Sequence, residues 1–139
     1  MVFEILGVNF LEIIKRYNYQ GVPMPLARKL ARQCLIGLDY MHRMCRIIHT
    51  DFKPENVLMT RSGKPLMADL GVAKQGVMKG RVVQATLRGG TPVYASPNVR
   101  QLFFQAKELP VTKRADFLQQ HPITHLDDFF ALGATILDV

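Results

Sequence analysis

The amino-acid sequence predicts an α+β fold in which helices predominate. Apolar residues recur at intervals of three or four between residues 25 and 42, which is the spacing of an amphipathic helix. Two short apolar segments, 56–59 and 65–68, are separated by a turn of hairpin length. The stretch 127–139 is almost wholly apolar, which is typical of a helix that is buried on every side.

The first part of the chain is predicted to form a strand and two helices. Residues 1–6 have the apolar character of a strand, and residues 7–17 carry apolar side chains close to helical spacing. Asn9 is placed to cap this first helix. A loop is expected over 18–25 because of its asparagine, glycine and prolines, and Pro25 then suits the opening of the second helix.

The second part of the chain has weaker signals. Residues 72–90 contain several glycines and basic residues with no clean period, so a long loop is expected there. A short helix is predicted from residue 97 to about 104, and the polar segment 106–124 is expected to be a surface insertion. Because the first strand has no earlier partner and the last helix no cover, we expect a piece of a larger domain.

Composition restricts the classes of protein that this chain can represent. Its 139 residues allow one domain, and 48% hydrophobic residues argue against wholesale disorder. The 18 basic and 11 acidic residues give a net charge of +7, but the basic residues are scattered, so no direct nucleic-acid partner is expected. No stretch resembles a signal peptide or a membrane span, so no membrane partner is expected. Two cysteines form no disulfide framework, which favours a cytoplasmic or nuclear location.

The segment 49–59 has the most specific pattern in the chain. Asp51 is followed by Lys53, Asn56 and a short apolar run. Phosphoryl transfer needs an acceptor for the substrate proton, a cation near the phosphoryl group and ligands for Mg²⁺. The predicted hairpin begins at Asn56, and its second strand ends just before Asp69, so the two side chains are expected to lie close together. Their oxygens are of the kind that Mg²⁺ prefers.

Four segments, in this order along the chain, resemble the eukaryotic protein kinases. They are similar to the catalytic loop, the metal-binding motif, the end of the activation segment and the central helix of the large lobe, at residues 49–56, 69–71, 90–97 and 128–133. The resemblance implies a partial kinase domain that runs from the hinge to the central helix. The hinge would be 1–7, the large lobe 8–139 and the activation segment 69–98.

The resemblance also implies roles for individual residues. Asp51 would be the catalytic base, Lys53 the cation beside the phosphate, and Asn56 and Asp69 the Mg²⁺ ligands. Asp128 would tie the catalytic loop to the central helix. The adenine of ATP would be held by four residues: Phe3, Glu4, Leu6 and Leu58.

The implied specificity is for serine and threonine. Lys53, together with Thr91 before a proline in the activation segment, is the pattern of serine/threonine kinases. Several segments up to residue 71 further resemble the SR-protein kinases, which implies a protein substrate rich in arginine and serine. Thr50 stands where kinases usually have arginine, so no strict need for phosphorylation of the activation segment is expected. Asn98 replaces a glutamate that usually forms a structural ion pair.

Three functional hypotheses follow. The first is a serine/threonine kinase; the second is a kinase-like protein that acts by binding partners; the third is a basic RNA- or phosphate-binding module. Intact Asp51, Lys53, Asn56 and Asp69 favour the first. The 139 residues contain no glycine-rich phosphate loop and no paired lysine and glutamate of a small lobe, so we expect little or no activity from this piece alone.

Overall fold

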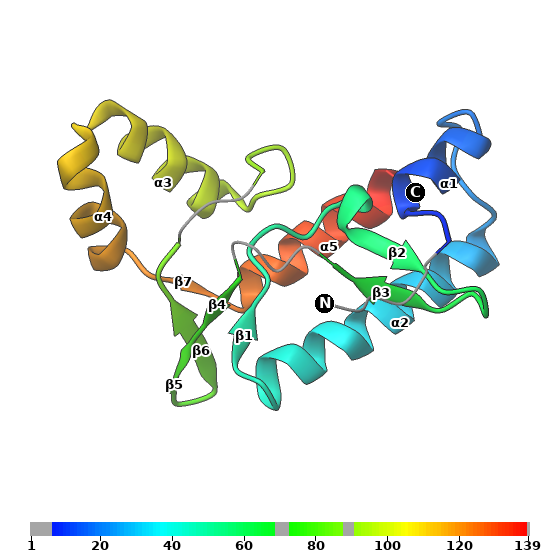
Figure 1. The fold of residues 1–139 in the computed structure, drawn as a ribbon, viewed down its shortest axis with the longest axis horizontal. Coiled ribbons are helices and arrows are strands. Elements are labelled where there is room, and N and C mark those ends of the chain that lie inside the picture. Colours follow the sequence, from blue (N-terminus) through cyan, green and yellow to red (C-terminus); the bar gives the residue numbers. More distant parts are fainter. Residues whose placement is uncertain (1–6, 69–72, 88–90, 139) are drawn as a thin grey trace.

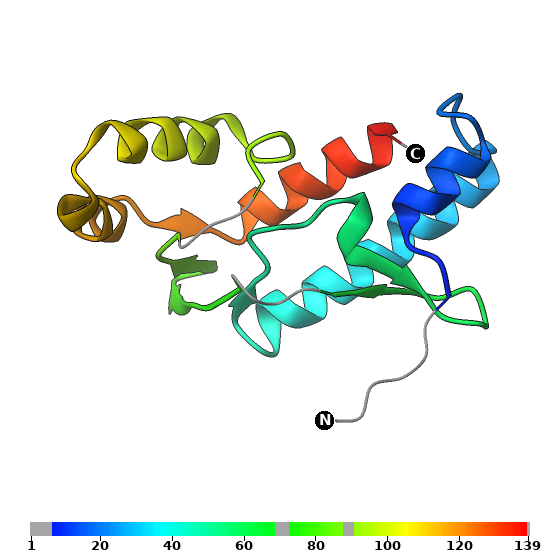
Figure 2. The same ribbon diagram turned by 45° about the horizontal axis from the view of Figure 1, so that its top comes forward.

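The computed structural model describes residues 7–68, 73–87 and 91–138 (Figures 1 and 2). The predicted strand over 1–6 lies outside this part. Helices predominate among the described residues, and the strands are short and antiparallel, which confirms the predicted α+β class. The helices are α1 (Phe10–Arg16), α2 (Met24–Arg43), α3 (Pro97–Glu108), α4 (Val111–Gln120) and α5 (Leu126–Asp138). None of them combines the length and the apolar character needed to cross a membrane.

The strands form three small sheets. β1 (Ile47–Ile48) pairs with β4 (Lys74–Gln75). A 3₁₀ turn, Pro54–Asn56, leads into β2 (Val57–Met59), which pairs with β3 (Pro65–Met67). The third sheet has the order β5 (Val77–Lys79), β6 (Val82–Ala85) and β7 (Ile123–Thr124).

The predicted helices α1 and α2 are confirmed. The Asn9 side chain accepts a hydrogen bond of 2.9 Å from the backbone N–H of Glu12, as expected of a helix cap. α2 begins one residue before Pro25 and buries Leu30, Cys34 and Leu38 at the predicted spacing. Burial raises the pKa of the Cys34 thiol to about 12, so Cys34 is a small buried hydrophobe rather than a reactive group.

The predicted hairpin between β2 and β3 is also confirmed. Val57 lies opposite Met67, and Met59 lies opposite Pro65. In the turn, the backbone N–H of Thr60 donates to the carbonyl of Lys64 at 2.8 Å, and Gly63 has a φ of 84°. A glycine suits this position because side chains disfavour positive φ.

Two hydrophobic clusters meet at the segment that carries the candidate site. The first joins α1, α2 and α5 and includes Phe52; the second lies between β6, β7 and α3 and includes Ile48. Figure 1 shows α2 and α5 side by side, with α3 and α4 on the far side of the short strands. Residues 49–51 therefore connect the two clusters and are restrained from both sides.

The prediction of a long loop over 72–90 is wrong for the described residues of this segment. They form β4, β5 and β6, and Gly80, with a φ of 64°, makes the turn between β5 and β6. β5 is exposed along its whole length, and each of these strands has only two to four residues. The sequence of these strands therefore lacks the regular alternation of apolar and polar residues by which a strand is recognised.

The segment 106–124 is more ordered than expected. α3 extends to Glu108 instead of ending near 104, and α4 follows it. α4 has no buried residue, so the segment does lie at the surface. The Arg114 side chain donates to the carbonyls of Leu109 and Lys107, at 3.0 and 3.2 Å, which caps the end of α3.

The prediction that the last helix is buried on every side is wrong for the described residues. Ala131, Leu132 and Thr135 of α5 are buried, but Phe130 is 45% exposed and Leu137 is 90% exposed. One side of α5 packs into the first hydrophobic cluster, and the other side faces away from it.

We expect Leu38→Ala to lower the free energy of unfolding by about 2–5 kcal/mol, because it leaves a cavity under α2. The Leu38 side chain is fully buried at 0% exposure. Leu35→Ala, on the same helix at 45% exposure, is the matched control and should cost well under half as much. Urea unfolding measures both variants, and equal losses would contradict this assignment of the core.

Candidate active site

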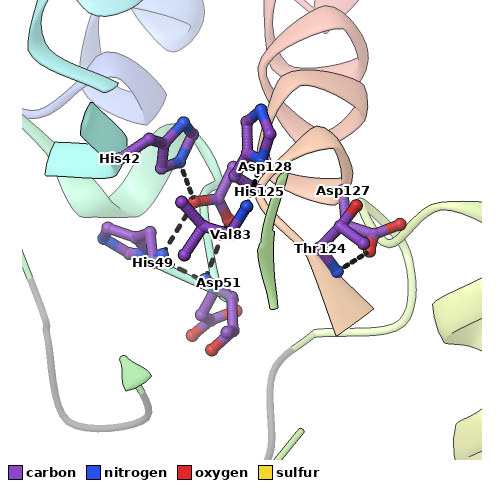
Figure 3. A network of polar contacts seen from close by, with 9 residues as sticks. His42, His49, Asp51, Val83, Thr124, His125, Asp127 and Asp128 are labelled. Atoms are coloured by element: carbon purple, nitrogen blue, oxygen red, sulfur yellow. Dashed lines mark hydrogen bonds and ion pairs between the residues drawn. The ribbon is translucent and has the colours of Figure 1, made fainter. Parts of the chain in front are cut away.

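The candidate site depends on one buried carboxylate, that of Asp128 on α5 (Figure 3). Its Oδ2 accepts hydrogen bonds from the backbone N–H of His49 and from His42 Nε2, both at 2.7 Å. Its Oδ1 accepts a bond of 2.9 Å from the backbone N–H of Thr50. Thr50 has a φ of 68°, which side chains disfavour, so these bonds hold the loop in a strained conformation.

His49 connects this loop to the β2–β3 hairpin. The backbone N–H of Asp51 donates to His49 Nδ1 at 3.2 Å, so the ring proton resides on Nε2. Nε2 then donates to the carbonyl of Ala68 at 2.8 Å. His49 is fully buried and stacks edge-to-face on Phe52, so its role is structural.

Asp51 has one carboxylate oxygen in contact with neighbours and one without. Oδ2 lies 3.7 Å from Lys53 Nζ and 3.4 Å from Asn56 Nδ2, and the same Nδ2 donates to the Asp51 carbonyl at 2.9 Å. Oδ1 is buried and has no hydrogen-bond partner among the described residues. A buried oxygen of this kind is suited to accept a hydrogen bond from a substrate hydroxyl.

Lys53 brings Thr91, from the predicted activation segment, to the site. Its Nζ donates to Thr91 Oγ1 at 2.8 Å and lies 3.6 Å from Glu55 Oε2. A cavity of about 20 Å³ beside Asp51 is lined by Thr91, Leu87 and Ser96, among others, which is room for about one water molecule. The structure thus places Asp51, Lys53 and Thr91 together.

The predicted ligands of ATP and Mg²⁺ are placed only in part. Phe3, Glu4, Leu6 and Asp69 lie outside the described residues. Leu58 is half-buried on β2, opposite Leu66. The backbone N–H of Ala68 donates to the carbonyl of Asn56 at 2.7 Å, so the residue before Asp69 is held against Asn56.

The Asn56 side chain fits its predicted role as one of the two metal ligands. The amide nitrogen of Asn56 is used by Asp51, which leaves its oxygen as the ligand atom. Within the described ranges, no group of three His, Cys, Asp or Glu residues is placed to hold a metal ion. The assignments of Asn56 and Asp69 to Mg²⁺, and of the four residues to adenine, stay predictions.

Sequence reasoning missed three residues that support the loop. His42, at the end of α2, follows Leu38 by one helical turn, and this spacing was the signal that it is buried. Asp127 accepts bonds from Ser96 Oγ at 2.7 Å and from the backbone N–H of Thr124 at 3.0 Å. His125 accepts a bond of 3.2 Å from the backbone N–H of Val83 and stacks edge-to-face on His42.

We expect Asp128→Asn to lower the free energy of unfolding by about 1–3 kcal/mol. The asparagine side chain has the same shape as that of Asp128, but only its oxygen accepts hydrogen bonds. Its NH₂ group would therefore face one of the donors that now bind the carboxylate. Asp116→Asn, at an exposed position of α4, is the control and should change little. Denaturant unfolding measures both, and equal stabilities would show that the Asp128 charge is not needed.

His125 should make stability depend on pH. Burial, and next the neighbouring His42, hold the pKa of His125 below its ordinary value. The unfolded chain therefore takes up the proton first as the pH falls below about 6.5, so stability decreases in that range. His125→Asn keeps an acceptor for Val83 and should flatten this decrease, whereas His121→Asn, at an exposed position, should not. Unfolding midpoints at pH 7.5 and 5.5 (about one unit on either side of the ordinary value) test the difference.

The comparisons with known proteins agree with this geometry. A serine/threonine-protein kinase SRPK from Physarum polycephalum is 57% identical over 65 residues, which are 47% of this chain and 15% of that protein. The serine/threonine-protein kinase SKY1 of Saccharomyces cerevisiae is 59% identical over 59 residues, 42% of this chain and 8% of that protein. The human SRSF protein kinase 3 is 54% identical over 59 residues, 42% of this chain and 10% of its own length.

The matched segments thus span about a sixth or less of these relatives and under half of this chain. The sequence model of the family described as "Protein kinase domain" matches further, over residues 1–139. Because that match covers the whole sequence, the chain belongs to the protein kinase family.

Proposed function

We propose that the protein containing these residues is a serine/threonine protein kinase that transfers the γ-phosphate of ATP to a protein hydroxyl. The observation that carries the proposal is the buried Oδ1 of Asp51, which has no partner among the described residues and lies beside the Lys53–Thr91 pair. A proton acceptor and a cation within 3.7 Å of each other are what phosphoryl transfer requires of the protein.

In the proposed step, Asp51 orients the substrate hydroxyl and takes its proton. The bond from the substrate oxygen to the γ-phosphorus forms while the bond to the ADP oxygen breaks. Lys53 offsets negative charge on the phosphoryl group, and Thr91 keeps the ammonium group in place. Mg²⁺ supplies charge neutralisation on the phosphates when bound, and we propose Asn56 and Asp69 to hold it.

The adenine is proposed to lie against Leu58 and to be gripped by Phe3, Glu4 and Leu6. The names of the relatives support a finer proposal, a protein substrate rich in arginine and serine. A cytoplasmic or nuclear location is proposed with it, because Cys34 and Cys45 are both free thiols, which fits a reducing compartment.

The test is phosphate transfer from labelled ATP to a peptide of arginine-serine repeats by the full-length protein. We expect Asp51→Asn to slow transfer about 100-fold or more, because the proton acceptor is lost. Asp116→Asn is the same chemical change at an exposed site and should leave the rate unchanged.

Stabilisation by Mg²⁺ and ATP, read as a shift in thermal unfolding, should survive Asp51→Asn. A lysine-serine repeat peptide separates a need for arginine from a need for positive charge. If the unaltered protein neither gains stability from ATP nor transfers phosphate, the kinase proposal fails and a kinase-like binding protein is the better account.

A further inference from the structure

The outward face of α2 has a charge distribution that the proposed catalysis does not use. α2 carries four basic residues, Arg28, Lys29, Arg32 and Arg43, against one acidic residue, Asp39. Asp39 pairs with Arg43 on the next turn. Arg28, Lys29 and Arg32 are exposed and form no ion pair with any described residue.

These three charges lie close together at a cost to the helix. Arg32 is four residues from Arg28 and three from Lys29, so the side chains are neighbours on the helix surface. Like charges at this spacing destabilise a helix by a few tenths of a kcal/mol per pair. They border a hollow of about 450 Å³ whose remaining lining is Gln33 and Ile36.

The next turns of the same face are apolar and exposed. Ile36 and Tyr40 are each 60% exposed, and Met44 at the end of the helix is 71% exposed. Lys29, Gln33, Ile36 and Tyr40 follow one another at three or four residues, so they form a single stripe about 17 Å long. Figure 1 shows α2 along the outer edge of the molecule, away from α3 and α4.

We propose that this stripe, together with Arg28 and Arg32 beside its first turn and Met44 at the end of α2, is a docking surface for an acidic amphipathic helix of a partner protein. The partner would place its carboxylates on Arg28, Lys29 and Arg32 and its apolar side chains on Ile36, Tyr40 and Met44. Charge complementarity and the stripe's helical spacing identify this occupant, because helices dock by anchors at such intervals. The one acidic residue on this part of α2, Asp39, is already paired with Arg43, so the same face of a second copy offers no free carboxylate to Arg28, Lys29 and Arg32.

The order of the residues also separates this partner from a membrane. A membrane-binding helix presents one apolar band along its length with basic residues beside it. Here the three unpaired charges occupy one end of the stripe, and the charges beside the apolar end, Asp39 and Arg43, neutralise each other. An elongated partner with segregated acidic and apolar ends matches that order.

The test is fluorescence anisotropy of the chain with a labelled synthetic helical peptide that has glutamates on its first turns and leucines on its last. We expect the combined change Arg28→Gln, Lys29→Gln and Arg32→Gln to weaken binding roughly tenfold or more. The control Arg61→Gln, Lys64→Gln and Arg81→Gln removes the same charges from exposed positions elsewhere and should have little effect.

Three further arms decide the interpretation. Tyr40→Ala should also weaken binding, whereas Phe104→Ala, at an exposed position of α3, should not. A peptide with lysine in place of glutamate should bind at least roughly tenfold more weakly. Equal binding of both peptides, equal losses in both triple variants, or binding to phosphatidylserine vesicles without binding to the acidic peptide would overturn the proposal.

Discussion

The arrangement of the site depends on a single buried carboxylate. Asp128 receives two backbone N–H groups from the catalytic segment and one imidazole from α2, at 2.7 to 2.9 Å. A charge at 1% exposure is stable only when such donors surround it, since desolvation costs several kcal/mol. In return, the Asp128 carboxylate joins α5 to α2 and to residues 49–50. Both of these partners lie 78 or more positions before Asp128 in the chain. Thr50, whose φ of 68° is strained, is held by one of these bonds through its backbone N–H.

Each further element of the site is attached to that anchored loop by a direct contact. His49 links the loop to Ala68, Asn56 fixes the Asp51 backbone, and Lys53 reaches Thr91 across 38 positions. Because Ile48 and Phe52 are buried in different hydrophobic clusters, the residues between them cannot shift without disturbing one or the other. This is preorganisation in the physical sense: the geometry around Asp51 is built from contacts within the chain.

What the sequence predicted well has a local physical cause. The spacing of Leu30, Cys34 and Leu38 gave α2, because a helix buries every third or fourth residue. β5 and α4 were missed because neither buries a residue, so no periodic signal marks them. The contacts that support the site were harder still to predict. The contacts of His42, Asp127 and His125 reach residues between 3 and 86 positions away, and no spacing in a single sequence reveals most of them. Asp128 was expected as an anchor only through the resemblance to kinases.

The way in which the loop is anchored also bears on its regulation. Where kinases usually have arginine at the position of Thr50, that cation links the loop to a phosphate on the activation segment. Here a threonine stands at that position and supplies no cation for such a phosphate, while its backbone N–H donates to Asp128. One described contact that joins the loop to that segment is the hydrogen bond from Lys53 Nζ to the neutral hydroxyl of Thr91. A hydroxyl bond of this kind needs no added phosphate, and the dispensability of phosphorylation of the segment stays a prediction. Because Lys53 Nζ also lies 3.7 Å from Asp51 Oδ2, the bond holds Thr91 against the candidate site.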